Sequence, residues 1–194
     1  MADAPDERSG GRRRWTRAEY HRLGDLGLLD DARTELLAGD IWNVPPLTPL
    51  CYTTIAMTAD LLRKVCGSTH STRQRGPVVL SDDTEPEPSV VVVPGSGRDY
   101  EDHHPTAAEV SLLVEVSDVS LDKDRELKSA LYAAAGVRHY WIVNLVDRQL
   151  EVYRDPALLA GGYGFKSEEV LVEGDTVTPL FMPDAALAVR DLLP

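Results

Sequence analysis

The chain has 194 residues, of which 43% are hydrophobic and 27% are charged, and its formal net charge is −12. A chain of this length can bury its core as one domain, and the composition is that of an ordinary globular protein. The negative charge argues against nonspecific coating of nucleic acid, because affinity for phosphate comes mainly from lysine and arginine. No apolar run is long enough to cross a bilayer, so we expect no membrane partner.

The amino terminus lacks the pattern of a secretory signal, so we expect a cytoplasmic location, where disulfides are rare. Cys51 and Cys66 also fall about four turns apart in one predicted helix, too far to bond each other. The polar, Gly-containing start predicts a disordered tail over residues 1–14, followed by a single domain over residues 15–194. The basic cluster at 12–14 either stays solvated in that tail or touches a phosphate backbone.

The first expected elements are a short helix and a hairpin. Thr16 and Glu19 form a capping-box pattern, which predicts a helix through about Leu23. The runs at 35–37 and 41–44 are typical of two strands that meet at a tight turn.

A long helix follows the hairpin. Thr48 suits its N-cap, Pro49 its first position and Gly67 its end. Apolar residues recur at helical spacing between them, so we expect this helix to cover a sheet.

The middle of the chain predicts the core of an α/β fold. Extended segments are expected at 77–80, 89–93 and 110–117, a second helix at 121–135, and further strands at 139–145 and 150–153. The remainder indicates an edge hairpin with a closing helical turn.

One carboxylate is unusual because it lies inside an apolar strand. Glu115 stands in the run Leu-Leu-Val-Glu-Val, where burial of a lone charge is costly and demands a positive partner. The partner could be a metal ion or, as a structural ion pair, Arg125 or Lys128. Side chains alternate along a strand, so Ser117 shares the face of Glu115.

Several segments resemble the Uma-type family of restriction endonucleases, which belongs to the PD-(D/E)XK nucleases. The resemblance covers nearly the whole chain after Trp15 and is strongest from Glu115 to Leu145. It lies in Thr34-Glu35-Leu36-Leu37-Ala38-Gly39-Asp40, Glu85-Pro86-Glu87-Pro88-Ser89-Val90-Val91-Val92-Val93, Val114-Glu115-Val116-Ser117-Asp118, Asp124-Arg125, Lys128, Tyr132-Ala133-Ala134-Ala135-Gly136-Val137 and Tyr140-Trp141-Ile142-Val143-Asn144-Leu145.

The resemblance implies a restriction-endonuclease-like mixed β-sheet flanked by helices, and a DNA endonuclease that depends on Mg²⁺ or Mn²⁺. It implies that Glu115 is the central metal ligand and that Lys128 orients or activates the water. Glu35 would be a third carboxylate near the metal.

Two positions depart from the family pattern. Ser89 stands where the family usually has Asp, and a serine supplies no negative charge to a hard divalent ion. Glu87, two residues earlier, could substitute as a metal ligand if the strand extends that far; Asp82 and Asp83 are more distant candidates. The family also tends to have a histidine where this chain has Cys51 or Tyr52.

Simpler interpretations stand beside these roles. Lys128 could extend to water, Glu35 could be an ordinary surface strand residue, and Glu87 could lie in a solvated loop. The histidines at 70, 103 and 104 lack partners at zinc-ligand spacing, so we expect them at the surface.

Three functions therefore remain open. The first is a magnesium-dependent DNA endonuclease. The second is a catalytically inactive family member that binds nucleic acid or protein as a homodimer. The third is a structural or regulatory homodimer that uses Tyr140 and Trp141 or the edge hairpin.

Overall fold

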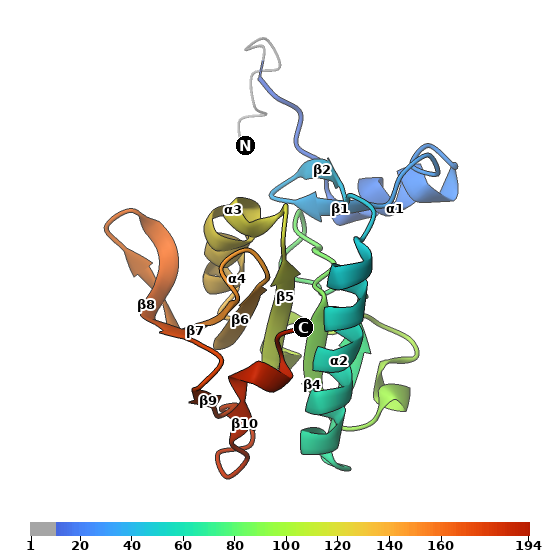
Figure 1. Ribbon diagram of the computed structural model, residues 1–194. Coiled ribbons are helices and arrows are strands. Elements are labelled where there is room, and N and C mark those ends of the chain that lie inside the picture. The colour runs from blue at the N-terminus through green and yellow to red at the C-terminus, as the bar shows by residue number, and fades with distance from the viewer. Residues whose placement is uncertain (1–10) are drawn as a thin grey trace.

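The structure is a computed structural model that describes residues 11–194, so most of the expected tail lies outside the described part. Its centre is a six-stranded sheet in the order β3-β4-β5-β6-β7-β8 (Figure 1). The strands β5 and β6 run parallel, and the other neighbours are antiparallel. The strands are β3 (His70–Gln74), β4 (Val90–Pro94), β5 (Leu112–Ser117), β6 (His139–Asn144), β7 (Gln149–Leu159) and β8 (Gly162–Leu171).

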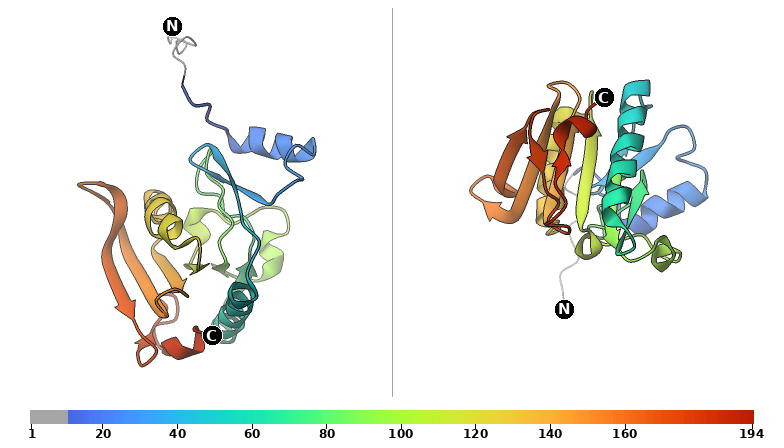
Figure 2. Two further views of the ribbon diagram at one scale, coloured as in Figure 1. Left: turned by 45° about the horizontal axis from the view of Figure 1, so that its top comes forward. Right: turned by 60° about the horizontal axis from the view of Figure 1, so that its bottom comes forward.

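Helices cover both faces of this sheet (Figure 2). Helix α2 (Pro49–Cys66) packs on one face together with the C-terminal segment, which holds β9 (Thr176–Val177), β10 (Leu187–Ala188) and the 3₁₀ turn η4 (Val189–Asp191). The other face is covered by α3 (Leu121–Lys123), the π-helical η3 (Asp124–Lys128) and α4 (Ser129–Ala134). Two further 3₁₀ turns are η1 (Gly97–Tyr100) and η2 (Ala107–Glu109). The expected mixed sheet flanked by helices is confirmed.

Helix α2 forms as its sequence predicts. The hydroxyl of Thr48 accepts a hydrogen bond from the Cys51 backbone at 3.2 Å, Pro49 occupies the first turn, and Gly67 ends the helix with φ of +55°. The apolar stripe is buried against the sheet, and it consists of Cys51, Ile55, Ala59, Leu62 and Cys66. Both cysteines are free and buried.

The short helix and the hairpin are also confirmed. Helix α1 (Arg17–Asp25) begins with the capping box of Thr16 and Glu19. Strands β1 (Thr34–Leu37) and β2 (Asp40–Asn43) join at a turn whose two central residues, Ala38 and Gly39, have positive φ. Backbone hydrogen bonds between Leu36 and Glu85 tie this hairpin to the segment before β4.

The basic cluster is paired with acids of the domain. Arg12 and Arg14 both contact the carboxylate of Asp40 at 2.9 Å, and Arg13 contacts Glu19 at 2.5 Å. These three cations therefore have partners within the protein, although they remain largely exposed.

One local prediction is wrong, and another differs in detail. Residues 77–80 form no strand, only an isolated bridge between Val79 and Thr106, and the partner of β4 is the polar strand β3. An edge strand that is polar on both faces gives no alternating signal, so the sequence did not indicate it. The helix expected at 121–135 forms, but its middle widens into the π turn η3.

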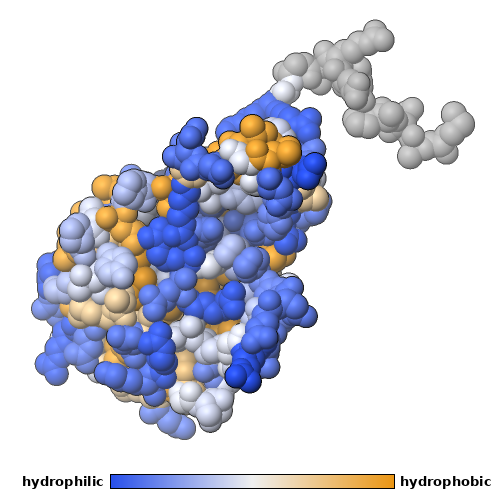
Figure 3. Space-filling model, turned by 90° about the vertical axis from the view of Figure 1, so that its right-hand side faces the viewer, coloured by the Kyte–Doolittle hydropathy of each residue, from blue (hydrophilic) through white to orange (hydrophobic). Residues whose placement is uncertain are grey.

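The hypothesis that Tyr140 and Trp141 form a dimer contact is also wrong. Both side chains are fully buried inside the monomer, so neither can contact a second copy. A homodimer through the β7–β8 edge hairpin stays a prediction. The face that carries α1 and α2 is mainly hydrophilic (Figure 3). Within residues 11–194, no helix combines the length and apolar character that a membrane span needs.

The packing of α2 can be tested with Leu62→Ala. Leu62 is fully buried against the sheet, so we expect its truncation to lower the free energy of unfolding by about 2–5 kcal/mol. Leu50→Ala on the same helix is a matched control, since Leu50 is half exposed and its truncation should cost less than about 0.5 kcal/mol. Equal losses for both variants in urea unfolding would contradict this packing.

Candidate functional site

Strand β5 aims its one carboxylate away from α2. Val114 and Val116 pack on the α2 face, whereas Leu113 packs on the face covered by α4. Glu115 shares the face of Leu113 because side chains alternate along a strand. Only 4% of Glu115 is exposed, so its charge depends on partners inside the protein.

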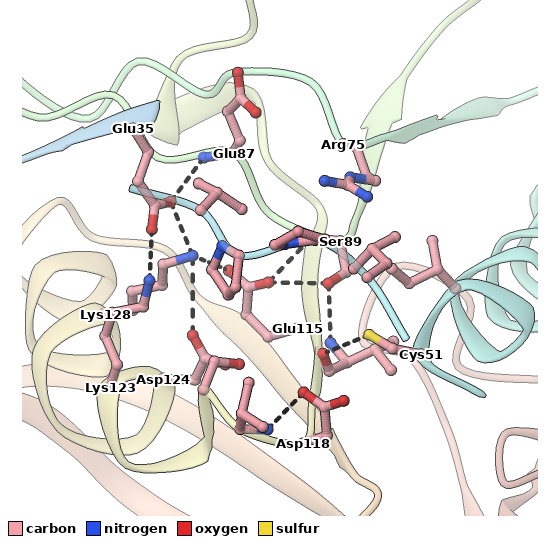
Figure 4. A pocket seen from close by; sticks show the side chains of 18 residues that line it. Glu35, Cys51, Arg75, Glu87, Ser89, Glu115, Asp118, Lys123, Asp124 and Lys128 are labelled. Carbon is pink, nitrogen blue, oxygen red and sulfur yellow. Dashed lines mark hydrogen bonds and ion pairs between the residues drawn. The ribbon is translucent and has the colours of Figure 1, made fainter. Parts of the chain in front are cut away.

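The carboxylate of Glu115 accepts four hydrogen bonds. Its Oε1 receives the Lys128 ammonium at 3.0 Å and the Tyr132 hydroxyl at 2.8 Å. Its Oε2 receives the backbone N–H and the hydroxyl of Ser89 at 3.0 and 3.1 Å (Figure 4). Ser89 thus orients Glu115 but adds no charge beside it.

Lys128 lies between two carboxylates from different strands. Its Nζ is 3.0 Å from Glu115 and 3.0 Å from Glu35, and 3.8 Å from Asp124 (Figure 4). Glu35 also contacts Lys123 at 2.9 Å and accepts the backbone N–H of Glu87 at 3.3 Å. The ammonium therefore links β1, β5 and the π turn η3 in one buried ion cluster.

The cluster fixes the protonation state of its lysine. Burial alone would lower the pKa of Lys128, but Glu115, Glu35 and Asp124 outweigh it and raise that pKa above its ordinary value. Burial likewise acts to raise the pKa of Glu35, yet Lys128 and Lys123 hold it below its ordinary value. Within this cluster Lys128 is therefore a cation near neutral pH and a hydrogen-bond donor.

Asp124 is a third acid beside Lys128. It is buried, and its Oδ2 accepts hydrogen bonds from the hydroxyls of Ser117 and Ser120 at 2.7 and 2.6 Å. Burial, with the nearby charge of Glu115, raises the pKa of Asp124 to about 6. This carboxyl can therefore change charge near neutral pH.

A cleft with a volume of about 70 Å³ opens beside the cluster, which is room for a few water molecules or a hydrated ion. Its acidic lining consists of Glu35, Glu87, Glu115, Asp118 and Asp124, and its basic lining of Arg75, Lys123 and Lys128. Five acids against three bases leave two negative charges in excess when all are ionised. The other walls come mainly from the 44–47 segment, the start of α2 and the turn after β5.

The structure brings together most of the residues selected from the sequence. Glu115, Lys128, Glu35 and Ser89 all meet at the cleft, and Arg125 pairs instead with Glu151 at 2.5 Å. Lys128 and Glu35 are 5% and 1% exposed, so the simpler interpretations of a lysine reaching water and a surface strand acid do not hold.

Glu87 occupies a different place from Ser89. Strand β4 begins at Val90, so the strand does not extend back to Glu87. The carboxylate of Glu87 pairs with Arg33 and points away from Glu115 (Figure 4). Asp82 and Asp83 do not line the cleft. A role for Glu87 as a metal ligand stays a prediction.

Several members of the site were not selected as site residues from the sequence. Tyr132 and Asp124 lie four residues on either side of Lys128, and this spacing already indicated that the three share one edge of the helix. Lys123 and Arg75 gave no such signal, since each approaches the cleft through the fold of distant segments.

Residues 11–194 contain no cluster of three or more His, Cys, Asp or Glu side chains arranged to hold a metal ion. The carboxylates of Glu35 and Glu115 instead share the ammonium of Lys128. The protein alone therefore offers no closed metal cage in its described part.

The described part is thus an α/β protein with a mixed sheet, in which a glutamate of the central strand β5 meets a lysine of the covering helical segment. A sequence model described as "putative restriction endonuclease" matches residues 17–190. The chain belongs to this family, the Uma-type family, as its sequence segments predicted.

The fold has a solved counterpart. A putative nuclease from Anabaena variabilis is similar with a TM-score of 0.68 over 91% of this chain and 96% of that chain. The two sequences are 16% identical, so this similarity shows the fold alone. None of the curated proteins matches this chain.

The ion cluster predicts a large effect of Lys128→Met. Loss of the ammonium leaves Glu115 and Glu35 buried without their shared cation, so we expect the free energy of unfolding to fall by about 3–5 kcal/mol. Adding Glu115→Gln to that variant should recover part of the loss, because one uncompensated charge is removed. Chemical denaturation of the single and double variants measures both effects; strictly additive losses would show that the two groups do not interact.

Asp124 predicts a dependence of stability on pH. Its pKa is about 6 in the folded protein against an ordinary value of 3.8, so the folded state binds the proton more tightly. The resulting stabilisation is complete below about pH 4 and is lost as the pH rises through about 6. Asp124→Asn removes this dependence, so wild type should lose stability relative to the variant between these pH values. A constant difference across that range, measured by urea unfolding, would contradict the assignment.

Proposed function

We propose that the protein is a DNA endonuclease that hydrolyses a phosphodiester bond with the help of Mg²⁺ or Mn²⁺. The observation that supports this most strongly is the buried array of Glu115, Lys128 and Glu35 beside an acidic cleft. Burial of charge on this scale is costly and is most often retained at sites that perform chemistry. Membership of the restriction endonuclease family gives the class of reaction.

The donor set at the cleft suits a loosely held divalent ion. Mg²⁺ is usually bound by one or two carboxylates together with water and substrate phosphates, so a closed protein cage is not required. Glu115 and Glu35 already share one cation, which places their oxygens close to each other. Because Glu87 is already paired with Arg33, one negative charge remains in excess in the lining, which favours a cation there.

In this proposal Glu115, supported by Glu35, would hold the ion, and the Ser89 hydroxyl would offer a neutral oxygen to it. The ion would supply positive charge to the phosphate and lower the pKa of a bound water. Lys128 would donate a hydrogen bond to the attacking water or to the phosphate. Tyr132 and the Ser89 backbone hold Glu115 in its orientation throughout.

A second candidate function has its own support. All four hydrogen-bonding positions of Glu115 are occupied, and Ser89 does not provide the charge of the family's aspartate. These two facts favour a catalytically inactive family member that binds nucleic acid or protein, in which the cluster stabilises the fold.

Cleavage of supercoiled plasmid DNA tests the first candidate. We expect wild type to nick the plasmid in millimolar Mg²⁺ or Mn²⁺ and to stop when the metal is chelated. Glu115→Gln should reduce the rate by about 100-fold or more, because it removes the charge that binds the ion. Glu126→Gln is the control, since Glu126 is exposed on the same helical segment. Nicking that survives chelation, or that Glu115→Gln leaves unchanged, would refute the metal-dependent site.

Ser89→Asp separates the two candidates. The new carboxylate would lie beside Oε2 of Glu115, so the variant should be less stable without metal and should gain thermal stability with Mn²⁺. The endonuclease candidate predicts that wild type shows a smaller shift of the same sign. A shift confined to Ser89→Asp, with no cleavage by wild type, favours the inactive candidate.

A cytoplasmic location and DNA as the partner agree with this function. Both stay predictions.

A further inference from the structure

One cation of the cleft is not used by the ion cluster. Lys123 contacts Glu35, and Lys128 contacts both Glu35 and Glu115. The Arg75 guanidinium, which also lines the cleft, has no ion-pair partner among residues 11–194. Figure 4 shows Arg75 on the Ser89 side of the cleft. The nearby acid Glu87 is itself paired with Arg33, so it does not neutralise Arg75.

The backbone around Arg75 is held in an unusual conformation. Arg75 follows β3 and has φ of +50°, a left-handed value that is unfavourable for a residue with a side chain. Its N–H donates to the carbonyl of Ser89 at 3.2 Å, and its carbonyl accepts from Arg33 at 2.6 Å. These bonds hold Arg75 beside Ser89 although a glycine, such as its neighbour Gly76, would suit the conformation better. Strain of this kind is often retained where a side chain must point into a functional site.

We propose that Arg75 binds a phosphate of the DNA backbone at the Ser89 side of the cleft. This inference rests on the proposed endonuclease function and adds a substrate-binding residue to it. An unpaired guanidinium can donate two parallel hydrogen bonds to phosphate oxygens, a geometry that lysine cannot reproduce. In a chain of net charge −12, an uncommitted cation at the cleft gives one backbone phosphate a favourable position next to Glu115.

The test uses the full-length chain and a labelled DNA duplex with phosphorothioate linkages, which resist cleavage, in millimolar Mg²⁺. Arg75→Asn removes the charge, and asparagine tolerates a positive φ, so the fold should survive; thermal unfolding checks this. Arg75→Lys keeps the positive charge but cannot donate two parallel hydrogen bonds to one phosphate. Arg138→Asn is the matched control, because Arg138 is exposed just before β6 and does not line the cleft.

Fluorescence anisotropy should show that Arg75→Asn weakens binding about tenfold and that Arg75→Lys weakens it less. The slope of log affinity against log salt should fall by about 0.9 for Arg75→Asn, the value for one lost phosphate contact. Arg138→Asn should bind as wild type does.

Wild-type affinity in Arg75→Asn, or an equal loss in Arg138→Asn, overturns the role of Arg75 and leaves the proposed function standing. If wild type itself fails to bind the duplex in the presence of metal, the proposed function fails and the role of Arg75 fails with it.

Discussion

The ammonium of Lys128, shared by Glu115 and Glu35, is the interaction on which the site depends. Each of these charged groups would be costly to bury alone. Together they are buried with the Lys128 nitrogen 3.0 Å from an oxygen of each glutamate. They come from the second half of the π turn, from a central strand and from the small hairpin, so the cluster requires all three elements to be in place. The same constraint keeps Lys128 charged near neutral pH, which suits it to hydrogen-bond donation and electrostatic stabilisation.

The acids around this ammonium give the cleft its character. With Glu87 paired to Arg33, one negative charge remains in excess in its lining, so the lining favours a divalent cation over a bare phosphate. Ser89 reduces that excess by one relative to an aspartate while it keeps Glu115 oriented through two hydrogen bonds. A weak metal site that the DNA phosphate completes is consistent with both facts, and Arg75 lies where such a phosphate would need a positive partner.

The sequence predicted the fold where the physical signals are local. Helix α2 has its cap, proline and terminal glycine within the chain, and the apolar runs of β4 and β5 identify central strands. The polar edge strand β3 could not be predicted, because its pairing with β4 is set by backbone hydrogen bonds and not by a pattern of side chains. Glu115 was found because a carboxylate conflicts with its apolar neighbours. Arg75 and Lys123 could not be found, since their roles arise from contacts between segments that are distant in the chain.

The most direct measurement is anomalous diffraction from crystals of the protein grown with Mn²⁺ and a phosphorothioate DNA duplex. If the cluster is a catalytic centre, a manganese peak will lie within ligand distance of Glu115, with a phosphate oxygen completing its coordination. If no peak occurs at the cleft while Lys128 still bridges Glu115 and Glu35, the cluster only stabilises the fold and the account of a metal-dependent endonuclease is contradicted.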